Sequence, residues 1–351
     1  MAYTTINKPN EYFDIKLWTG NGSTQTISGL SFQPDLVWGK SRSTNYEQSW
    51  IDSVRGGTKY LFSNGFSAES TDANAITAFN SDGYDLGSSP YIGNANTITY
   101  VGWNWLAGGT ASSNTDGSIT SSVSANTDSG FSVVTWTGTG ANATVGHGLG
   151  VVPKITIVKG RDAVTNWIVG GSLIEDVGGS TNNYILLNTE APMDTSVDLY
   201  ASYNTDTIGV KTDTNINGSG QGMVMYCFSE VKGYSKFGSY TGNGSATDSP
   251  FIYTGFKPSF FMVKKTNSTG NKWVIIDNKR NPINGATGLG LKPNANDAEE
   301  SFSGFNIDFL SNGFKPYSNW DGYNASGGTY IYMAFAENPL VGTNNVPATA
   351  R

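Results

Sequence analysis

One short phrase occurs three times in this chain of 351 residues. It reads "LWTGNGS" at residues 17–23, "TWTGTGA" at 135–141 and "SYTGNGS" at 239–245. Each copy is followed at a similar distance by a proline segment, namely "FQPDLVWGK", "GVVPKITIVK" or "FKPSFFMVK". Each then closes on an aromatic-rich segment, "ITYVGWNW", "GMVMYCF" or "TYIYMAF". Landmarks that recur in one order predict an internal triplication.

The repeated unit is expected to be made of β-strands. Thr-Gly-Asn-Gly is typical of a hairpin turn, because Asn and Gly accept the positive φ of type I′ turns. Asp82-Gly83 and Asn312-Gly313 repeat this turn signal later in the first and third units. Short strands at intervals of about ten residues indicate a β-sandwich. The sequence therefore predicts an all-β fold of three tandem β-sandwich domains, jelly-roll-like and related by internal repeat.

The landmarks also predict the domain boundaries. We expect a strap at 1–11, sandwich repeats at 12–108, 131–233 and 234–340, a polar spacer at 109–130 and a C-terminal tail at 341–351. The spacer is assigned because its residues are small and polar, with room for one short strand around 119–123.

Alternation along the closing strands separates two faces. One face is large and apolar in every copy, for example Val101, Trp103 and Trp105, and is the predicted core. The opposite face is too apolar for open solvent in the second copy, so we expect it to meet the other sheet, the next unit or another subunit. The candidates for a subunit interface are Met223, Met225, Cys227, Tyr330 and Tyr332.

Composition excludes several functions. The net charge of -7 and the scarcity of clustered Lys and Arg argue against nucleic-acid binding. No apolar run approaches the roughly 20 residues that span a bilayer, and the first residues lack the pattern of an export signal, so membrane insertion is not expected. Cys227 is the single cysteine, so the chain holds no internal disulfide or thiolate metal cluster.

Candidate catalytic residues fit the scaffold better than a reaction. His147 is the single histidine and lies between two glycines, which favours a turn residue over a member of a Ser-His-Asp triad. Asp52 and Asp277 each precede an arginine by three residues, which favours an ion pair over the carboxylate pair of a glycosidase. We expect no enzyme activity and no cofactor.

Two further patterns have structural interpretations. Lys40, Lys159 and Lys264 recur six residues after the prolines, and we expect each ammonium to reach solvent or an acid such as Asp52 or Asp277. "DTNINGSG" at 213–220 matches half of a calcium loop, but Val224 stands where the loop needs its bidentate acid. No metal site is therefore predicted.

The loop "PYSNWDGYN" at 316–324 lies outside the repeated apolar pattern and concentrates aromatic and polar residues. Sugar C–H faces stack on aromatic rings while their hydroxyls need polar partners. The candidate glycan-binding residues are Tyr317, Asn319, Trp320, Asp321 and Tyr323. The alternatives are that this loop packs on a neighbouring subunit or within its own domain.

The amino-acid sequence also resembles a family of virion structural proteins of marine bacteriophages, described as hypothetical or tail-fibre proteins. The resemblance rests on the start "MAYTTINKPNEYF", on "DSVRG" at 52–56, on "NTDGSITSSVSANTDSGFSVV" and on the endings "EVKGYSKFGSYTGNGS" and "GGTYIYMAFAENP". It covers nearly the whole chain and suggests no catalytic residues.

This resemblance implies a protein made in the host cytoplasm and assembled into an extracellular particle. Its expected partners are other virion proteins, copies of itself, with a trimer as one arrangement, and a host cell-surface glycan. The strap is then expected to dock on a tail or capsid protein. The expected function is a tail-fibre or appendage component that contributes to host attachment; the alternative is a structural role in capsid decoration or in a fibre or tail shaft.

Overall fold

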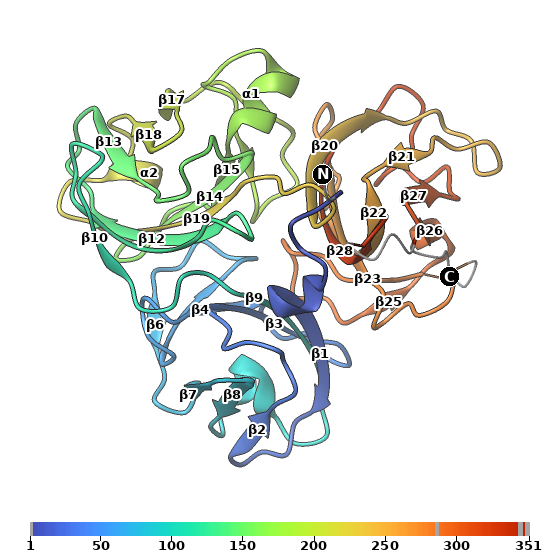
Figure 1. The fold of residues 1–351 in the computed structure, drawn as a ribbon, viewed down its shortest axis with the longest axis horizontal. Helices are drawn as coiled ribbons and strands as arrows, with labels where there is room; N and C mark the ends of the chain where they lie inside the picture. Colours follow the sequence, from blue (N-terminus) through green and yellow to red (C-terminus); the bar gives the residue numbers. More distant parts are fainter. Residues whose placement is uncertain (1–2, 285–287, 343–346, 348–351) are drawn as a thin grey trace.

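Three lobes of β-structure surround a common centre in the computed structural model, which describes residues 3–284, 288–342 and 347 (Figure 1). Lobe 1 extends from β1 to β9, lobe 2 from β10 to β19 and lobe 3 from β20 to β28. The prediction of an all-β fold built from sandwiches is confirmed, since each lobe pairs a larger sheet with a three-stranded one.

Lobe 1 begins after the short helix η1 (Pro9–Glu11), and η2 (Pro90–Asn94) precedes its last strand. Its strands are β1 (Phe13–Thr19), β2 (Gln25–Ile27), β3 (Leu36–Ser41), β4 (Ser49–Asp52), β5 (Lys59–Phe62), β6 (Ser70–Thr71), β7 (Ile76–Asn80), β8 (Gly83–Leu86) and β9 (Thr99–Trp105). The main sheet has the order β1-β9-β3-β4-β5-β6, and the small sheet is β2-β8-β7.

Lobe 2 also holds the helices α1 (Ser172–Gly178) and α2 (Thr214–Asn217). Its strands are β10 (Ser112–Asn114), β11 (Ser121–Asn126), β12 (Phe131–Thr137), β13 (Ala143–Gly146), β14 (Ile155–Gly160), β15 (Ile168–Gly170), β16 (Ile185–Leu186), β17 (Tyr200–Tyr203), β18 (Thr207–Val210) and β19 (Gly222–Phe228). The main sheet is β10-β11-β12-β19-β14-β15-β16, and the small sheet is β13-β18-β17.

Lobe 3 contains one short helix, η3 (Ser303–Phe305), among its described residues. Its strands are β20 (Ser235–Thr241), β21 (Ile252–Tyr253), β22 (Phe256–Lys265), β23 (Val274–Asp277), β24 (Leu289–Gly290), β25 (Glu300–Ser301), β26 (Ile307–Leu310), β27 (Gly313–Pro316) and β28 (Thr329–Pro339). The main sheet is β20-β28-β22-β23, the small sheet is β21-β27-β26, and β24 pairs with β25.

One antiparallel strand order therefore recurs in all three lobes. The orders β1-β9-β3-β4, β12-β19-β14-β15 and β20-β28-β22-β23 correspond strand by strand to the repeated sequence landmarks. In each lobe the closing strand lies between the strand that leads into the repeated glycine phrase and the strand that follows the landmark proline or, in lobe 3, contains it. The repetition in the sequence is thus also a repetition of topology.

The second face of each closing strand packs inside its own sandwich. Met223, Met225 and Cys227 join a cluster with residues of the small sheet of lobe 2. Tyr330 and Tyr332 do the same in lobe 3. All five side chains are at most 4% exposed. Their assignment to a subunit interface is therefore wrong, because the small sheet of the same chain already covers them.

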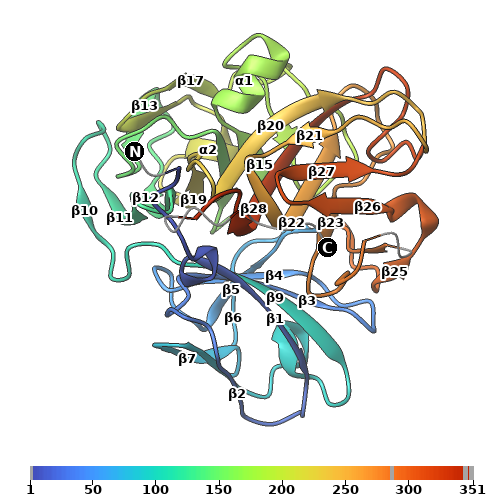
Figure 2. The ribbon, with the colours of Figure 1, turned by 45° about the vertical axis from the view of Figure 1, so that its right-hand side comes forward.

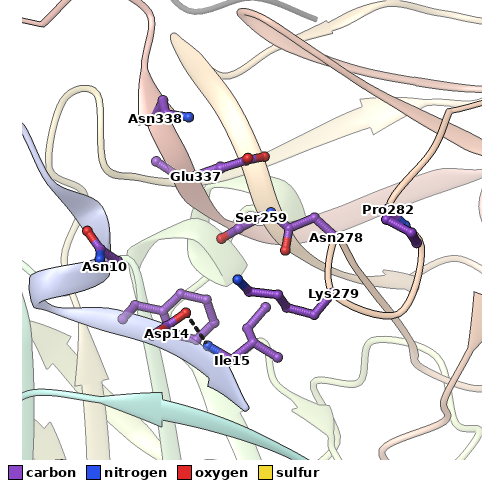
Figure 3. Close-up of a pocket in the computed structure, with 11 residues that line it drawn as sticks. Asn10, Asp14, Ile15, Ser259, Asn278, Lys279, Pro282, Glu337 and Asn338 are labelled. Carbon is purple, nitrogen blue, oxygen red and sulfur yellow. Dashed lines mark hydrogen bonds between the residues drawn. The ribbon is translucent and has the colours of Figure 1, made fainter. Parts of the chain in front are cut away.

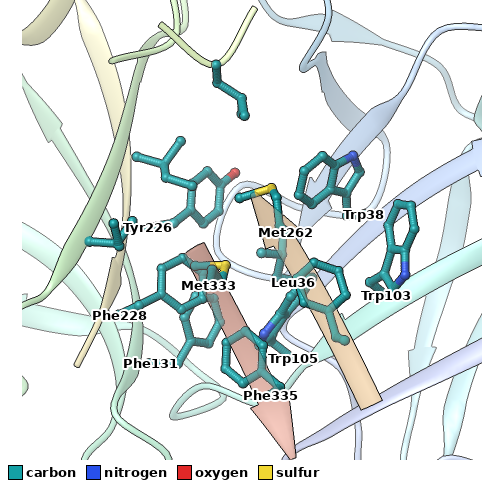
Figure 4. Close-up of a cluster of buried hydrophobic side chains, with 14 of the residues drawn as sticks. Leu36, Trp38, Trp103, Trp105, Phe131, Tyr226, Phe228, Met262, Met333 and Phe335 are labelled. Atoms are coloured by element: carbon teal, nitrogen blue, oxygen red, sulfur yellow. The ribbon is translucent and has the colours of Figure 1, made fainter. Parts of the chain in front are cut away.

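The first face of each closing strand meets the other lobes instead of its own small sheet. Trp105 of lobe 1, Phe228 of lobe 2 and Phe335 of lobe 3 lie together in one buried cluster (Figure 4). The ring centroid of Trp105 is 6.2 Å from that of Phe228 and 5.7 Å from that of Phe335. The closing strands are consequently buried on both faces. The lobes share a central core in addition to the buried cluster inside each sandwich, whereas the tandem arrangement implied only separate cores.

The repeated glycine phrase connects the two sheets of each sandwich. In lobe 1 it joins β1, which pairs with β9, to β2, which pairs with β8. The prediction of a hairpin at this position is therefore wrong. The later turn signals are hairpins as predicted, since Asn80 pairs with Gly83 and Leu310 pairs with Gly313 across two-residue turns.

A buried asparagine in each lobe holds this connection. In lobe 3, Asn324 accepts a hydrogen bond from the backbone N–H of Asn243 and donates to the carbonyl of Ser245 at 2.9 Å. Asn94 and Asn217 make the corresponding bonds in lobes 1 and 2. The first glycine of the phrase is needed for this approach, since a Cβ at Gly20 would lie 2.2 Å from the carbonyl oxygen of Ala95.

The three recurrent lysines link the lobes in a closed ring. Lys40 of lobe 1 donates to the carbonyl of Asn296 in lobe 3. Lys159 of lobe 2 donates to Phe66 in lobe 1, and Lys264 of lobe 3 donates to Glu190 in lobe 2. All three are at most 1% exposed and also donate to carbonyls of their own lobe. The expectation that they reach solvent or an acid is wrong.

These buried lysines predict how stability depends on pH. Burial lowers the pKa of Lys40, Lys159 and Lys264 to about 8. Because the unfolded chain binds more protons than the folded one between about pH 8 and 10, the free energy of unfolding rises with pH in that window. We expect a rise of about 1 kcal/mol or more per lysine between about pH 7.5 and 9.5 in denaturant titrations.

In the Lys159→Met variant the free energy of unfolding should rise less with pH, because the contribution of one buried lysine is removed. In Lys8→Met the rise should equal that of wild type. Lys8 is the control because its side chain is 71% exposed. If the free energy of unfolding rises equally with pH in wild type and in Lys159→Met, then burial does not lower the pKa of Lys159.

The strap and the spacer belong to the folded body. Ile6 is 2% exposed and lies in the shared core, while the hydroxyl of Thr4 donates to the carbonyl of Lys232 at 2.7 Å. The described part of the strap therefore docks on its own chain, whereas we expected it to order against a tail or capsid protein. The spacer is also corrected, since it supplies β10 and β11 to the sheet of lobe 2. Most of the predicted tail at 341–351 lies outside the described residues.

Candidate functional site: a groove on lobe 3

The residues with the greatest chemical reactivity are bound into the scaffold. His147 is fully buried, and its Nδ1 accepts a hydrogen bond from Leu149, so Nε2 carries the proton and donates to the carbonyl of Asn204. Burial lowers the pKa of His147 and raises that of Cys227 to about 12. Both groups are therefore neutral and enclosed at neutral pH, which does not suit a base or a nucleophile.

The two aspartates considered as catalytic carboxylates form buried ion pairs. Asp52 lies 2.5 Å from Arg55, and Asp277 lies 2.6 Å from Arg280, with all four side chains at 0% exposure. The tyrosine hydroxyl of Tyr226 also donates to Asp52, from another lobe. The interpretation as ion pairs is confirmed, and these carboxylates hold the lobes together.

The segment that resembles half of a calcium loop forms the short helix α2. Asp213 caps it by accepting the backbone N–H of Asn215 at 2.7 Å, and Asn217 holds the glycine phrase of lobe 2. Among the described residues, no group of three or more His, Cys, Asp or Glu side chains could hold a metal ion.

The loop at 316–324 lines a groove on the outer side of lobe 3. Figure 2 shows β26 and β27, which precede this loop, at the edge of the molecule. The groove has a volume of about 330 Å³. Three of the predicted residues line it: Tyr317, Asn319 and Trp320. Tyr317 is 37% exposed.

The other two predicted residues lie elsewhere. The carboxylate of Asp321 forms an ion pair with Lys265 at 2.6 Å, and the hydrogen bond from that lysine lowers the pKa of Asp321. Tyr323 is fully buried, and its hydroxyl donates to the carbonyl of Asn306 at 3.1 Å. Burial raises the pKa of Tyr323 well above its ordinary value. The assignment of Tyr323 as a ligand-binding residue is therefore wrong, because its ring belongs to the core of lobe 3.

Several contacts fix the shape of the loop. Asn324, which holds the glycine phrase, also donates to the carbonyl of Ser318 at 2.7 Å. The Trp320 ring packs edge to face against Phe305 and Tyr323, with centroid distances of 5.1 and 5.4 Å. Since these rings are buried, the half-buried indole is held in a fixed orientation beside the groove.

Sequence reasoning missed the opposite wall of the groove. Phe302 is 42% exposed and lies 5.8 Å from Trp320 between ring centroids, with the rings nearly perpendicular. Asn306 adds an amide to the same wall. An exposed aromatic residue in the Ser- and Gly-containing stretch "ESFSGF" was the available signal. The groove thus combines three aromatic side chains with two amides.

The described residues include no helix that is long and apolar enough to cross a membrane. No match was found among curated proteins or among solved structures. The model of one family, a domain of unknown function designated DUF7483, matches residues 8–339. Since this match covers nearly the whole length, the chain belongs to the DUF7483 family.

Proposed function

We propose that this chain is a structural protein of a bacteriophage virion, and that it contributes to host attachment by binding surface glycan in the groove on lobe 3. The observation that carries the binding role is the groove itself. Tyr317 and Phe302 expose ring surface there, and the half-buried ring of Trp320 contacts both Phe302 and the buried Phe305. Exposed rings beside amides suit a sugar, whose C–H faces stack and whose hydroxyls need hydrogen-bond partners.

A binding role agrees with the state of the ionisable groups. The carboxylates and the histidine considered for catalysis are buried and already paired with scaffold atoms. A rigid scaffold that presents side chains on surface loops is typical of binding modules. The virion setting rests on the sequence resemblance described above.

The groove predicts which variants lose binding. Tyr317→Ala and Phe302→Ala should each weaken binding to host-cell glycan about tenfold or more, because each removes one stacking surface of about 1.5 kcal/mol. Binding to isolated host polysaccharide, measured by surface plasmon resonance, is the direct test. Both residues are exposed, so thermal unfolding should change little in either variant.

Tyr91 supplies the matched control. It lies in η2, the corresponding segment of lobe 1, before the asparagine that holds the glycine phrase, and is 57% exposed. Tyr91→Ala should leave glycan binding unchanged. Equal binding by wild type, Tyr317→Ala and Phe302→Ala would contradict the hypothesis that the groove binds glycan.

One observation favours the alternative, a purely structural role in capsid decoration or in a fibre or tail shaft. Phe66 of lobe 1 and Val164 of lobe 2 are 60% and 71% exposed, and the N–H of Thr165 donates to the carbonyl of Phe66. Adjacent exposed apolar side chains at a junction between lobes suit contact with another virion protein. Antibody labelling of intact particles separates the two roles, since label confined to capsid facets would exclude host attachment.

A further inference from the structure

A second, larger cavity lies at the junction of lobes 3 and 1, on a different part of the molecule from the groove. It has a volume of about 550 Å³, within the range of small-molecule sites. Asn10 and Asp14 line it from η1 and β1, and Ser259, Asn278, Lys279 and Glu337 line it from lobe 3. In Figure 3 the side chain of Lys279 extends between Asp14 and Ser259.

The equivalent position at the junction of lobes 1 and 2 is filled by the protein itself. There Asp35 accepts hydrogen bonds from the backbone N–H groups of Ala107 and Gly109, and from the hydroxyl of Ser53. These two backbone N–H groups reach Asp35 because the chain passes beside it after β9, on its way into lobe 2.

In lobe 3 the chain takes another path. The closing strand β28 continues to Pro339, which pairs with Phe256 of β22. Asn278 corresponds to Ser53, since its N–H donates to the carbonyl of Ser259 as that of Ser53 donates to Asp35. No returning amide from the described residues fills this place, and the polar groups at the junction line a cavity.

One buried atom marks this cavity as incomplete. Asn278 is 5% exposed, and its side-chain oxygen is buried without a hydrogen-bond partner among the described residues. A buried acceptor that is left unpaired destabilises the folded state. Lys279 is exposed and lines the cavity. A bound ligand that donates to Asn278 and accepts from Lys279 would satisfy both groups.

The mixed charges of the wall restrict the class of ligand. Asp14 and Glu337 oppose an anion, and Lys279 opposes a metal cation. Amides, a hydroxyl and both signs of charge together suit a neutral molecule with several hydroxyl groups, each of which can donate and accept. We propose that this cavity binds one or two units of a neutral saccharide, at a site separate from the groove on lobe 3.

Saturation-transfer NMR tests this proposal with glucose, galactose, mannose and N-acetylglucosamine as probes. At least one should receive saturation from the wild-type protein. The affinity should fall about tenfold in Lys279→Ala and in Asn278→Ser, each of which removes one hydrogen bond to the sugar. Tyr317→Ala, which alters only the groove, should keep the signal. The proposed groove and this cavity can therefore fail independently.

The Asn278→Ser variant also separates binding from folding. It installs the residue that lobe 1 has at the equivalent position, and it removes the unpaired oxygen, so its melting temperature should equal or exceed that of wild type. Lys279→Ala changes an exposed side chain and should melt as wild type does. The proposal is overturned if none of the four sugars receives saturation, or if the affinity is unchanged in both variants, or if it is lost in Tyr317→Ala.

Discussion

Replacement of Trp105 by alanine is expected to lower the free energy of unfolding by about 4 kcal/mol. The ring is 1% exposed and contacts aromatic rings from all three lobes. Its centroid lies 4.8 Å from Phe13, 6.2 Å from Phe228 and 5.7 Å from Phe335. Removing it leaves a cavity where the lobes meet, so the loss should not remain within lobe 1.

Hydrogen exchange followed by mass spectrometry measures this spread. In Trp105→Ala, protection should fall by similar amounts in β9, β19 and β28, because the three closing strands form one cooperative unit. Phe66→Ala is the control, since that side chain is 60% exposed and its loss should change stability by less than about 0.5 kcal/mol. Loss of protection confined to lobe 1 would contradict a shared core.

The sequence predicted the strands and their faces but not what covers each face. Alternation in "ITYVGWNW" separates Trp103 and Trp105 from Tyr100 and Asn104, and the structure keeps that separation. Periodicity, however, reports only that a face is apolar. Whether Met225 meets a small sheet, another lobe or another subunit depends on how the units are arranged, which a local pattern does not encode.

The same limit explains the errors at the recurrent lysines and the glycine phrase. A lysine at a strand end is usually solvated, but Lys159 finds carbonyl acceptors on two lobes that only the closed arrangement brings together. Asn21-Gly22 in "TGNG" has the residues of a type I′ turn, yet the hydrogen bond from Asn21 to Asn94 directs the chain to the second sheet. In both cases long-range partners decide between local alternatives.

Only part of the candidate site was predicted from the sequence, for a similar reason. Composition correctly indicated that aromatic residues gather at 316–324, and Tyr317 and Trp320 do line a groove. It could not separate Tyr323, whose hydroxyl finds the carbonyl of Asn306 inside the lobe, from its exposed neighbours. Phe302 was missed because it reaches the groove from outside the loop, on the other side of the β26–β27 hairpin.

The buried ion pair in lobe 3 supports the second large prediction. Arg280→Ala is expected to lower the free energy of unfolding by about 3 to 5 kcal/mol. The guanidinium donates to Asp277 at 2.6 Å, to Glu299 at 3.1 Å and to the carbonyl of Ile275 at 3.1 Å. Without it, Asp277 stays buried as a carboxylate whose remaining side-chain donor is the indole N–H of Trp103 in lobe 1.

Two comparisons identify the cause of that loss. Lys236→Ala breaks an ion pair with Glu230 whose side chains are 34% and 30% exposed, and should cost less than about 1 kcal/mol. The double variant Asp277→Leu with Arg280→Met removes both charges and should recover much of the stability, because apolar side chains of similar volume replace a buried pair at little cost. If urea titrations show the double variant to be as unstable as Arg280→Ala, then the uncompensated charge is not the cause, and the pair acts through the hydrogen bonds that join β23 to lobe 1.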